Sequence, residues 1–546
     1  MKSRVLLSVV ILLGGVLPAL SQTYRNPVIH QDFSDPDVCR TGDDYWMTAS
    51  SFNCFPGLPI LHSRDLVHWE QAGSALTDYP GDGSTEFRDS VMHGCGVWAP
   101  AIRFHEGWYY IFCGDPDRGI FMVRTRDPRG RWEAPVWLVR QKGFIDPCPF
   151  WDDDGRAWLS HAAAGSRAGL KSVVFVAEMS PDGTSLLEPS RIVFDGHDSH
   201  PTIEGTKMYK RDGYYYIFAP AGGVSAGWQT VLRSKHPYGP YEDRIVMASA
   251  PGTINGPHQG AWVDTPEGED WFIHFQDKGA YGRIVHLQPM SWDEDGWPVI
   301  GIDPDGDGTG QPVGEYPLPV PEAPSALFAG ESCHPYGLPY GWQYPAVPSP
   351  YWHYVLPDGG IRLFSAEYHG KGLWDCPNLL LQKFPAEGFT ITAMLLFVPN
   401  PSLKEKGETA GLVVFGEDYA GLRLVDSVFG AKLQSFRCEG ASKGGQEKVK
   451  DIDTLEYYED GSVELTVRLE VSARKTGGPV QDAVCRFSYS VEGGPFRRVG
   501  TEFTASPGLW VGARWGFYCT RNVPKNDSGH VDVLDLKLEL SEPSVR

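Results

Sequence analysis

The sequence predicts an all-β protein built as a five-bladed β-propeller followed by a β-sandwich. Aromatic residues are abundant, with 18 Trp, 24 Tyr and 26 Phe, and they occur beside 63 Gly and 44 Pro. This composition favours many short strands joined by turns over a helical bundle. The chain of 546 residues is also too long for one ordinary hydrophobic core, so we expect at least two domains.

The first 21 residues have the pattern of a signal peptide. Lys2 and Arg4 precede an apolar run at 5–17, and the small-residue letters ALS follow at 19–21. This order is typical of a cleaved export signal. Because the apolar run is shorter than the roughly 20 residues that cross a bilayer, we expect a periplasmic or secreted protein without membrane insertion.

Residues 22–315 carry five copies of a turn followed by an aromatic strand. Each copy places Asp or Glu in a turn, beside Gly in most copies, ahead of a β-rich run. Repeats of about 50 residues with this content are typical of propeller blades, so five copies predict five blades. The copies are GDDYWMTAS at 42, HEGWYYIFC at 105, DDGRAWLSH at 153, RDGYYYIFA at 211 and PEGEDWFIH at 266.

One position upstream of each turn holds a residue that could belong to an active site. Eight residues before the turn acids stand Asp35, Trp98, Asp146 and Glu204, and nine residues before the fifth stands His258. Each residue alone has an ordinary explanation, since Asp-Pro pairs start turns and single Trp residues fill cores. A shared register in five blades, however, predicts that these side chains meet at one end of the central channel.

The charge balance excludes one class of partner. The formal net charge is −21 and no basic run occurs. Because such a field repels phosphate, we do not expect nucleic acid as a partner. A neutral substrate is compatible with this charge.

The motifs around these residues resemble the glycoside hydrolases of family 43. Those enzymes are five-bladed propellers that cleave glycans containing xylose and arabinose. Two further stretches, GLPILHSRDLVHW and GRIVHLQP, are most similar to the β-xylosidase and α-L-arabinofuranosidase branch. The other matching stretches are RNPVIHQDFSDPDV, GVWAPAIRFHEGWYYIF, FIDPCPFWDDDG, TIEGTKMYKRDGYYY and HQGAWVDTPEGEDWFIHF.

The resemblance implies a role for each of the three acids. Asp35 would be the general base and Glu204 the general acid, while Asp146 would modulate the pKa of the acid and orient it. Hydrolysis with inversion needs one protonated carboxyl for the leaving oxygen and one carboxylate to activate water on the opposite face of the sugar. Acids on different blades, facing one another across a channel, suit the gap that this water requires.

Three further residues are candidates for substrate binding. Trp98 is a possible sugar platform, and Arg283 in YGRIVHLQP resembles the substrate arginine of the family. The resemblance implies that His258 lies beneath the sugar and can contact a channel cation, often calcium, through waters. Catalysis itself is expected to need no cofactor, and a site with one imidazole would bind calcium weakly. The sequence therefore leaves the channel ion open.

The remaining sequence predicts a linker and a second domain. Residues 316–330 are rich in proline and indicate a stiff, extended linker. From 331 to 546, alternating segments such as FTITAMLLFVP and SVELTVRLEVS indicate half-buried strands of a sandwich. This region resembles the concanavalin-like β-sandwich that follows the propeller in many family 43 β-xylosidases, where it can close one side of the pocket.

We therefore expect an exo-acting, inverting glycoside hydrolase that releases xylose or arabinose from hemicellulose, with a xylo- or arabino-oligosaccharide as its substrate. Two alternatives stand beside this hypothesis. An endo-arabinanase would need an open groove, against which the appended sandwich counts. A non-catalytic glycan-binding propeller would use the same fold but would have no need of Asp35 and Glu204 together.

Overall fold

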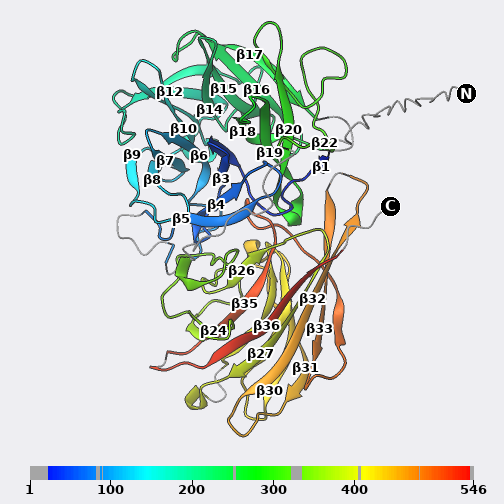
Figure 1. Cartoon of the computed structure of the whole chain (residues 1–546). Coiled ribbons are helices and arrows are strands. Elements are labelled where there is room, and N and C mark those ends of the chain that lie inside the picture. The colour runs from blue at the N-terminus through cyan, green and yellow to red at the C-terminus, as the bar shows by residue number, and fades with distance from the viewer. Residues whose placement is uncertain are drawn as a thin grey trace, which may run out of the picture.

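A computed structural model describes residues 22–80, 87–88, 90–249, 254–320, 335–403, 407–478, 480–524 and 526–541. The predicted signal peptide, 1–21, lies outside these residues. The described chain is almost entirely strand and turn, and it forms two bodies that lie side by side (Figure 1). Its helices are α1 (Gly165–Ala168) and the 3₁₀ turns η1 (Gly279–Tyr281), η2 (Pro335–Gly337), η3 (Pro401–Leu403) and η4 (Ala441–Lys443). Within the described ranges, none of them has the length and apolar character needed to cross a membrane.

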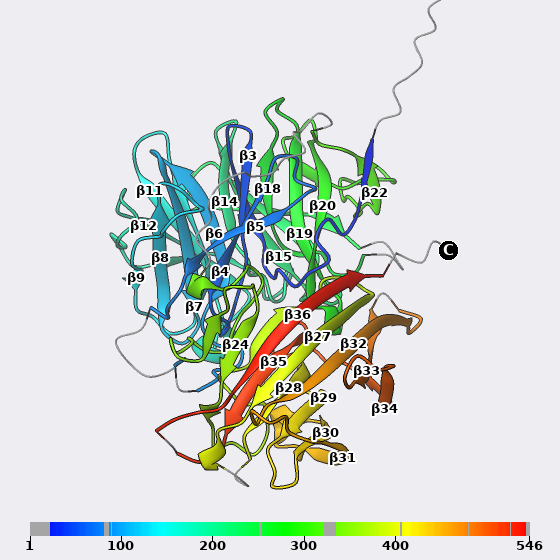
Figure 2. The ribbon, with the colours of Figure 1, turned by 60° about the horizontal axis from the view of Figure 1, so that its bottom comes forward.

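The first body is the predicted five-bladed propeller (Figure 2). Each blade is a four-stranded antiparallel sheet in which strands adjacent in sequence are adjacent in space. The blades are β2 (Asp37–Thr41), β3 (Asp44–Thr48), β4 (Gly57–Ser63) and β5 (Glu70–Leu76); β6 (Trp98–His105), β7 (Trp108–Asp115), β8 (Gly119–Thr125) and β9 (Val136–Val139); β10 (Phe144–Trp151), β11 (Ala157–Ala163), β12 (Val173–Met179) and β13 (Arg191–Asp195); β14 (Lys207–Arg211), β15 (Tyr214–Ala221), β16 (Trp228–Ser234) and β17 (Glu242–Ala248); β18 (His258–Asp264), β19 (Asp270–Asp277), β20 (Arg283–Trp292) and β21 (Pro298–Ile300).

The first strand of each blade is the innermost. Strand β2 packs against β6 and β18, and β10 packs against β6 and β14, so these strands surround a common axis. The five turns predicted from the repeats link the first and second strands of the five blades. At Asp212 and Gly213, φ angles of 49° and 73° form the tight hairpin turn that matches the right-handed twist of its strands. The five-bladed prediction is therefore confirmed.

The two ends of the propeller are joined by a short ribbon. Strand β1 (Thr23–Arg25) pairs with β22 (Glu315–Pro317), with Thr23 opposite Pro317. The Asn26 side chain reinforces this closure, because its amide donates to the carbonyls of Leu287 and Val313. The predicted linker, 316–330, therefore starts inside this ribbon, because β22 ends at Pro317. Residues 321–334 lie outside the described chain.

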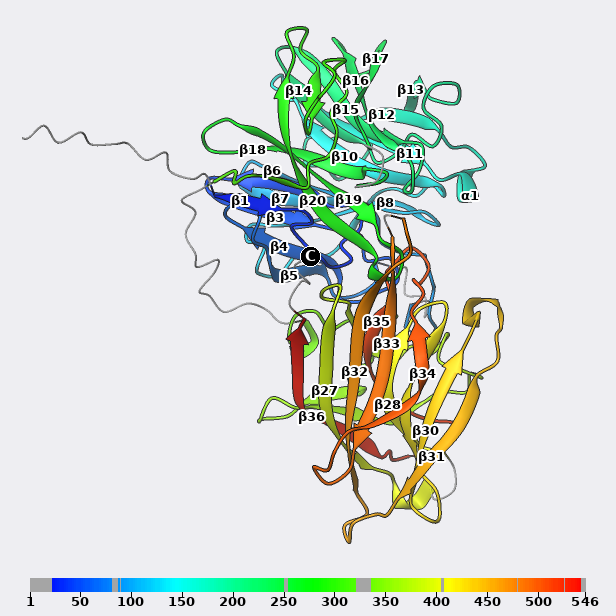
Figure 3. The same ribbon diagram turned by 90° about the vertical axis from the view of Figure 1, so that its right-hand side faces the viewer.

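The second body is a sandwich of two antiparallel-rich sheets (Figure 3). One sheet has the order β23 (His353–Val355), β24 (Ile361–Phe364), β36 (His530–Leu540), β27 (Phe389–Val398), β32 (Val463–Lys475), β33 (Gln481–Ser490) and β34 (Arg497–Thr504). The other has the order β25 (Ala366–Glu367), β35 (Arg514–Arg521), β28 (Thr409–Phe415), β29 (Tyr419–Val425), β30 (Ala431–Cys438) and β31 (Lys448–Leu455), with β26 (Leu380–Lys383) also paired to β35.

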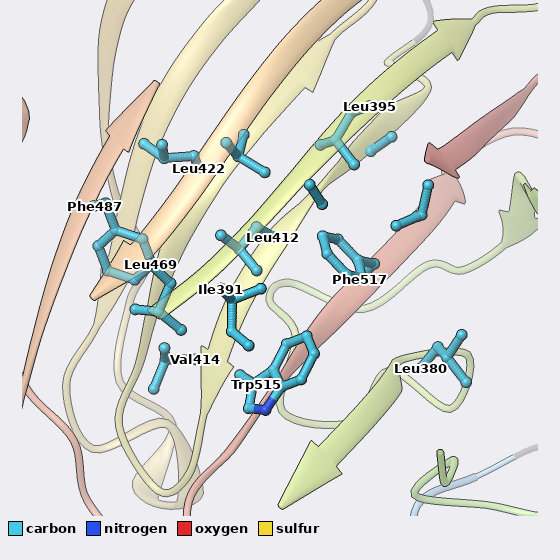
Figure 4. Close-up of a cluster of buried hydrophobic side chains, with 14 of the residues drawn as sticks. Leu380, Ile391, Leu395, Leu412, Val414, Leu422, Leu469, Phe487, Trp515 and Phe517 are labelled. Carbon is cyan, nitrogen blue, oxygen red and sulfur yellow. The ribbon is translucent and has the colours of Figure 1, made fainter. Parts of the chain in front are cut away.

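The core of the sandwich lies between these sheets. Along β27 every second residue is buried, as the alternating sequence predicts for a strand with one face inward. Ile391 and Leu395 from β27 face Leu412 of the opposite sheet, and Trp515 and Phe517 of β35 lie in the same layer (Figure 4). The nine cysteines in the described chain are all free thiols, and Cys333 lies outside it.

Direct contacts join the sandwich to the propeller. Phe55 and Tyr344 exchange backbone hydrogen bonds at 2.9 and 2.8 Å. The Ala513 amide donates to the carbonyl of Ala280 at 2.7 Å, and the Gly512 amide donates to the Asp32 carboxylate at 2.9 Å. These contacts hold the loop before β35 against the end of the propeller where the first strands begin.

Candidate active site

The residues predicted from the repeats lie where the first strand of each blade begins. Their backbone conformations, however, do not repeat at the same position in every blade. Each blade has one residue with positive φ at this level: Asp35 (56°), Ala99 (26°), Asp146 (56°), Gly205 (66°) and Gln259 (44°). In the second, fourth and fifth blades, this residue follows the predicted one. Irregular pairing at Trp98/Ala101 and His258/Gly260 accounts for two of these offsets. The strained backbone, costing about 1–3 kcal/mol at each non-glycine position, marks this level of the channel.

Asp35 is buried and tightly oriented. Its Oδ2 accepts hydrogen bonds from the hydroxyls of Ser34 at 2.8 Å and Ser50 at 2.5 Å. Ser50 is itself positioned by the Ala99 amide, which donates to its Oγ at 2.7 Å. The second oxygen, Oδ1, faces the Arg283 guanidinium at 3.5 Å. Because both hydroxyls bind Oδ2, Oδ1 is the oxygen left to accept a proton.

Arg283 therefore belongs to the site and does not form a surface ion pair. It is buried, and its Nη1 donates to Ser34 Oγ at 2.7 Å. Its backbone amide donates to Asp32 at 2.9 Å, so the same aspartate holds both Arg283 and the sandwich loop at Gly512. The guanidinium lies 4.8 Å from the ring centre of Phe275.

Asp146 and Glu204 form a connected pair of carboxyl groups. The Gly205 amide donates to Asp146 Oδ2 at 2.7 Å, which positions Glu204 through the adjoining backbone. Burial, followed by repulsion from the Glu204 carboxylate, raises the pKa of Asp146 to about 8. The predicted like-charge interaction is thus present, and it raises the pKa of the buried partner. Asp146 therefore keeps its proton near neutral pH.

A buried cation lies near this pair. The Lys207 side chain is buried, and its ammonium has no hydrogen-bond partner among the described residues. Its positive charge lowers the pKa of Asp146, opposing the effects of burial and of Glu204. The sequence analysis did not single out Lys207, because a lysine two residues after a Gly carries no signal of a channel position.

His258 is the immediate neighbour of Glu204. Its Nε2 lies 3.2 Å from Glu204 Oε1, and the ring is almost wholly buried whereas the Glu204 side chain is 33% exposed. The imidazole can therefore hold the acid from below while the carboxyl remains open to a substrate. The other ring nitrogen, Nδ1, has no partner in the described chain.

Trp98 forms one aromatic wall beside the acids. Its indole nitrogen donates to the Gly94 carbonyl at 2.9 Å, which fixes the ring. The ring packs edge to face with Phe52, at a centroid distance of 6.3 Å. The Arg167 guanidinium, carried by α1, lies 5.4 Å from the Trp98 ring centre.

The sandwich contributes a residue that sequence reasoning missed. Trp510, on the loop before β35, meets Trp98 edge to face at 6.2 Å, and the Arg283 guanidinium lies 5.6 Å from its ring. Its φ of 66° is unusual for a bulky residue, and the side chain is 46% exposed. No local pattern marks GLWVG as part of a site formed by strands more than two hundred residues away.

The structure thus brings together all six residues predicted for the site. Asp35 and Arg283 form one connected group, and Asp146, Glu204 and His258 form another on different blades. Half-buried Trp98 and exposed Trp510 add aromatic surface beside Arg283. The site can offer a proton from one carboxyl pair and a proton acceptor at Asp35 Oδ1, which is the equipment for acid and base catalysis.

Comparisons with known proteins agree with this geometry. A family model described as glycosyl hydrolases family 43 matches residues 24–298, and one described as the β-xylosidase C-terminal concanavalin A-like domain matches 335–538. The chain is 36% identical over 506 residues, 91% of its length, to a Xylanibacter ruminicola protein provisionally named a β-xylosidase, of which 86% is covered. It is 30% identical over 493 residues to a non-reducing end α-L-arabinofuranosidase of Bacteroides ovatus, covering 85% of this chain and 86% of the relative.

A solved structure supports the fold over both domains. The xylan β-1,4-xylosidase of Bacillus halodurans superposes with a TM-score of 0.76 at 24% identity, covering 94% of this chain and 99% of that one. At this level of identity, the likeness concerns the architecture.

Proposed function

The chain belongs to glycosyl hydrolase family 43, and we propose on that premise that it releases single xylose or arabinose units from the ends of hemicellulose chains. It is a glycoside hydrolase, so its substrate is a carbohydrate. The observation that carries the proposal is that Asp35 lies close enough to Asp146 to act on it electrostatically, next to Glu204, while Asp35 and Asp146 each have their own positioning contacts. We further propose that hydrolysis inverts the configuration at the anomeric carbon.

Glu204 is the proposed general acid. Its carboxyl is the more exposed member of the pair, so it can approach the glycosidic oxygen of a bound sugar. Asp146 keeps a proton on the pair near neutral pH and holds the backbone at Gly205. His258 supports Glu204 from the channel side. When the glycosidic bond breaks, the proton of the pair passes to the departing oxygen.

Asp35 is the proposed general base. With Oδ2 bound by Ser34 and Ser50, Oδ1 can accept the proton of a water molecule that attacks the anomeric carbon. The Arg283 guanidinium lies 3.5 Å from Oδ1 and places a positive charge beside this carboxylate. Because the attacking water and the leaving oxygen lie on opposite faces of the sugar, this arrangement leads to inversion.

Removal of terminal units is supported by the contact between the domains. Trp510 from the sandwich stands against Trp98 and near Arg283, and it narrows the space beside the acids. An aromatic wall of this kind suits the apolar face of a single terminal sugar. The names of the relatives divide between xylose and arabinose, and we propose that the site accepts both.

The described side chains around His258 do not by themselves supply a full set of calcium ligands, so an ion held there would depend on waters. Calcium takes six to eight oxygen ligands, whereas the described chain has no cluster of three or more His, Cys, Asp or Glu residues arranged to hold a metal. The buried ammonium of Lys207 near Asp146 adds positive charge at this level. We therefore propose a mechanism that uses protein side chains alone, with no step routed through an ion.

The proposal includes export. The basic start, the apolar run at 5–17 and the small residues at 19–21 support a cleaved leader and a periplasmic or secreted enzyme. Polysaccharide substrates are found outside the cytoplasm, which is consistent with this location. Cell fractionation of the full-length protein, with mass determination of its mature N-terminus, tests it.

The experiment for the activity follows the reaction of xylobiose by proton NMR. The wild-type enzyme should release α-xylose first, before mutarotation produces the β-anomer. Asp35→Asn should abolish turnover, and Glu204→Gln should lower kcat by about 10²–10⁴-fold, both with wild-type melting temperatures. First release of β-xylose would refute the base role of Asp35, and near-normal rates in Glu204→Gln would refute the acid role. The same assay with 4-nitrophenyl α-L-arabinofuranoside tests the second sugar.

A further inference from the structure

A hollow of the propeller lies away from the acids, at the opposite mouth of its channel. A pocket of about 580 Å³ is lined by residues from the first strands of all five blades or the turns that follow them. These include Arg40, His105, Trp151, Arg211 and Asp264, which stand at the ends of strands whose beginnings carry the catalytic constellation. A volume of this size falls within the range of ligand sites.

Two other hollows neighbour this pocket in series, each sharing wall residues with the one before it. A second hollow of about 740 Å³ shares His105 and Trp151 with the first. A third, of about 340 Å³, shares Arg126 with the second. We call the three together the distal groove. Because neighbouring hollows share wall residues, they lie side by side, and together they offer more room than one compact small molecule needs.

Aromatic rings line the distal groove. Phe104 is 45% exposed at the mouth of the channel. The rings of His105 and Trp151 stack at a centroid distance of 4.6 Å and an angle of 9°, on the wall between the first two hollows. Burial lowers the pKa of His105, so this ring is neutral. Trp108, in the second hollow, lies under the Arg126 guanidinium at 4.3 Å. Phe104 is thus the open apolar surface of this region, whereas one face of Trp108 is covered by Arg126, and His105 and Trp151 cover each other's facing sides.

The charged residues of the distal groove are largely paired with one another. Arg40 forms a two-pronged ion pair with Asp264, at 3.1 and 2.6 Å. Lys210 lies 3.1 Å from Asp153, and Arg211 lies 3.4 Å from Asp270. Because these charges neutralise each other, the distal groove does not need a charged ligand to balance them. The donors and acceptors that the ion pairs leave unused can form hydrogen bonds with the hydroxyls of a ligand. The net charge of −21 also disfavours an anionic partner.

A neutral polysaccharide packs its apolar sugar faces on aromatic rings and forms hydrogen bonds through its hydroxyls. The rings and the ion-paired residues of the distal groove offer both kinds of contact. We propose that the distal groove is a second, non-catalytic carbohydrate-binding site that holds a neutral polysaccharide chain. The contacts to the sandwich at Asp32, Phe55 and Ala280 lie outside it. A chain bound there would keep the enzyme on its polymer while the acids remain free to act on another chain end. The choice of polysaccharide as the ligand rests on the proposed function.

The test measures binding of the full-length protein to insoluble xylan, insoluble arabinan and cellulose by depletion from solution. Phe104→Ala is the first variant, because its exposed side chain can be removed without opening the core. Trp151→Ala is the second, checked by thermal unfolding. Phe429→Ala is the matched control, since this ring is 87% exposed on the sandwich, far from the distal groove in sequence and domain. Hydrolysis of 4-nitrophenyl β-xylopyranoside is recorded for each protein.

We expect the wild type and Phe429→Ala to bind at least one polymer equally. Phe104→Ala and Trp151→Ala should raise the apparent Kd at least fivefold, with kcat/KM on the nitrophenyl substrate within twofold of wild type. Equal binding by Phe104→Ala and wild type, or no binding of the wild type to any of the three polymers, would overturn the inference. Loss of polymer binding in Phe104→Ala, in a protein that hydrolyses no nitrophenyl glycoside, would support the distal groove and count against the proposed activity.

Discussion

The replacement Asp146→Asn isolates the charge that controls the proton of the acid pair. Asparagine has nearly the same shape as aspartate. Its side-chain oxygen can still accept the hydrogen bond that the Gly205 amide donates to Asp146 in the wild type, at 2.7 Å. The negative charge beside Glu204 disappears. The pair also loses the carboxyl whose raised pKa holds a proton near neutral pH. We therefore expect the basic limb of the kcat/KM profile to move toward lower pH in the variant.

The magnitude follows from the pKa of Asp146. In the wild type, this pKa of about 8 places the loss of the shared proton near pH 8. Removal of a close like charge shifts such a limb by about 1–3 pH units. Each pH unit lowers kcat/KM about tenfold above the limb, since the rate follows the protonated fraction. At pH 8, where the wild type is itself half protonated, the variant should thus be slower than the wild type by about 5- to 500-fold.

The pH dependence of folding stability provides an independent test of the raised pKa of Asp146. The pKa of Asp146 is raised in the folded protein, from an ordinary value of 3.8 to about 8. A raised pKa contributes stability that is fully present below about pH 4 and is lost as the pH rises through about 8. The loss amounts to about 1.4 kcal/mol per pH unit within this window. The melting temperature of Asp146→Asn, relative to wild type, should therefore rise between pH 4 and pH 8.

The assay uses xylobiose, whose leaving group needs a proton, at pH values from 4 to 9.5. 4-Nitrophenyl β-xylopyranoside serves as the contrast, because its good leaving group depends less on the acid. The expected shift of the basic limb should be clear with xylobiose and smaller with the nitrophenyl substrate. An unchanged basic limb in Asp146→Asn, or a melting-temperature difference independent of pH, would refute the reasoning.

Four further outcomes are expected. Trp510→Ala should lower kcat/KM on xylobiose about tenfold, equivalent to the ~1 to 1.5 kcal/mol of an aromatic pair, and Trp510→Phe should restore most of it; equal rates in all three would exclude the sandwich from the site. Lys207→Met should move the basic limb to higher pH, opposite to Asp146→Asn, because Lys207 lowers the pKa of Asp146, and a shift the other way would contradict its placement. Gly205→Ala should lower kcat and reduce the melting temperature by about 3 °C, since a Cβ at φ 66° would lie 2.8 Å from Gln259 Oε1; wild-type kinetics would show that Glu204 does not depend on this backbone. Dialysis against EDTA should leave kcat/KM unchanged, whereas recovery of lost activity by added calcium would contradict the metal-free mechanism.

Sequence reasoning was most successful where one repeat carries both structure and chemistry. The turns at Asp212-Gly213 and its equivalents lie between the first and second strands of each blade, so counting back from them reached the channel end. The count could not reveal the offset of one residue at Ala99, Gly205 and Gln259. These positions lie beside β-bulges or before the strand begins, where backbone geometry depends on packing against neighbouring blades.

The sequence pattern also could not predict which side chains contact one another in the site. Asp35 was predicted as a base, but the sequence does not show that Ser34 and Ser50 bind the same oxygen while Arg283 faces the other. Serines before and after a strand are ordinary turn residues. The role of Ser34 arises because the start of the first blade meets the third strand of the fifth blade, where Arg283 donates a hydrogen bond to Ser34 across 249 residues of chain.

What the sequence by itself determined is the architecture and which acids stand at the channel register, because both depend on local periodicity and on residue type at a repeated position. What only the tertiary structure decided is the electrostatics and the boundary of the site. Burial decides that Asp146 has the raised pKa, and desolvation depends on every atom around the carboxyl. Docking of the sandwich decides that Trp510 stands beside Arg283, a contact between two domains that no periodicity within either one encodes.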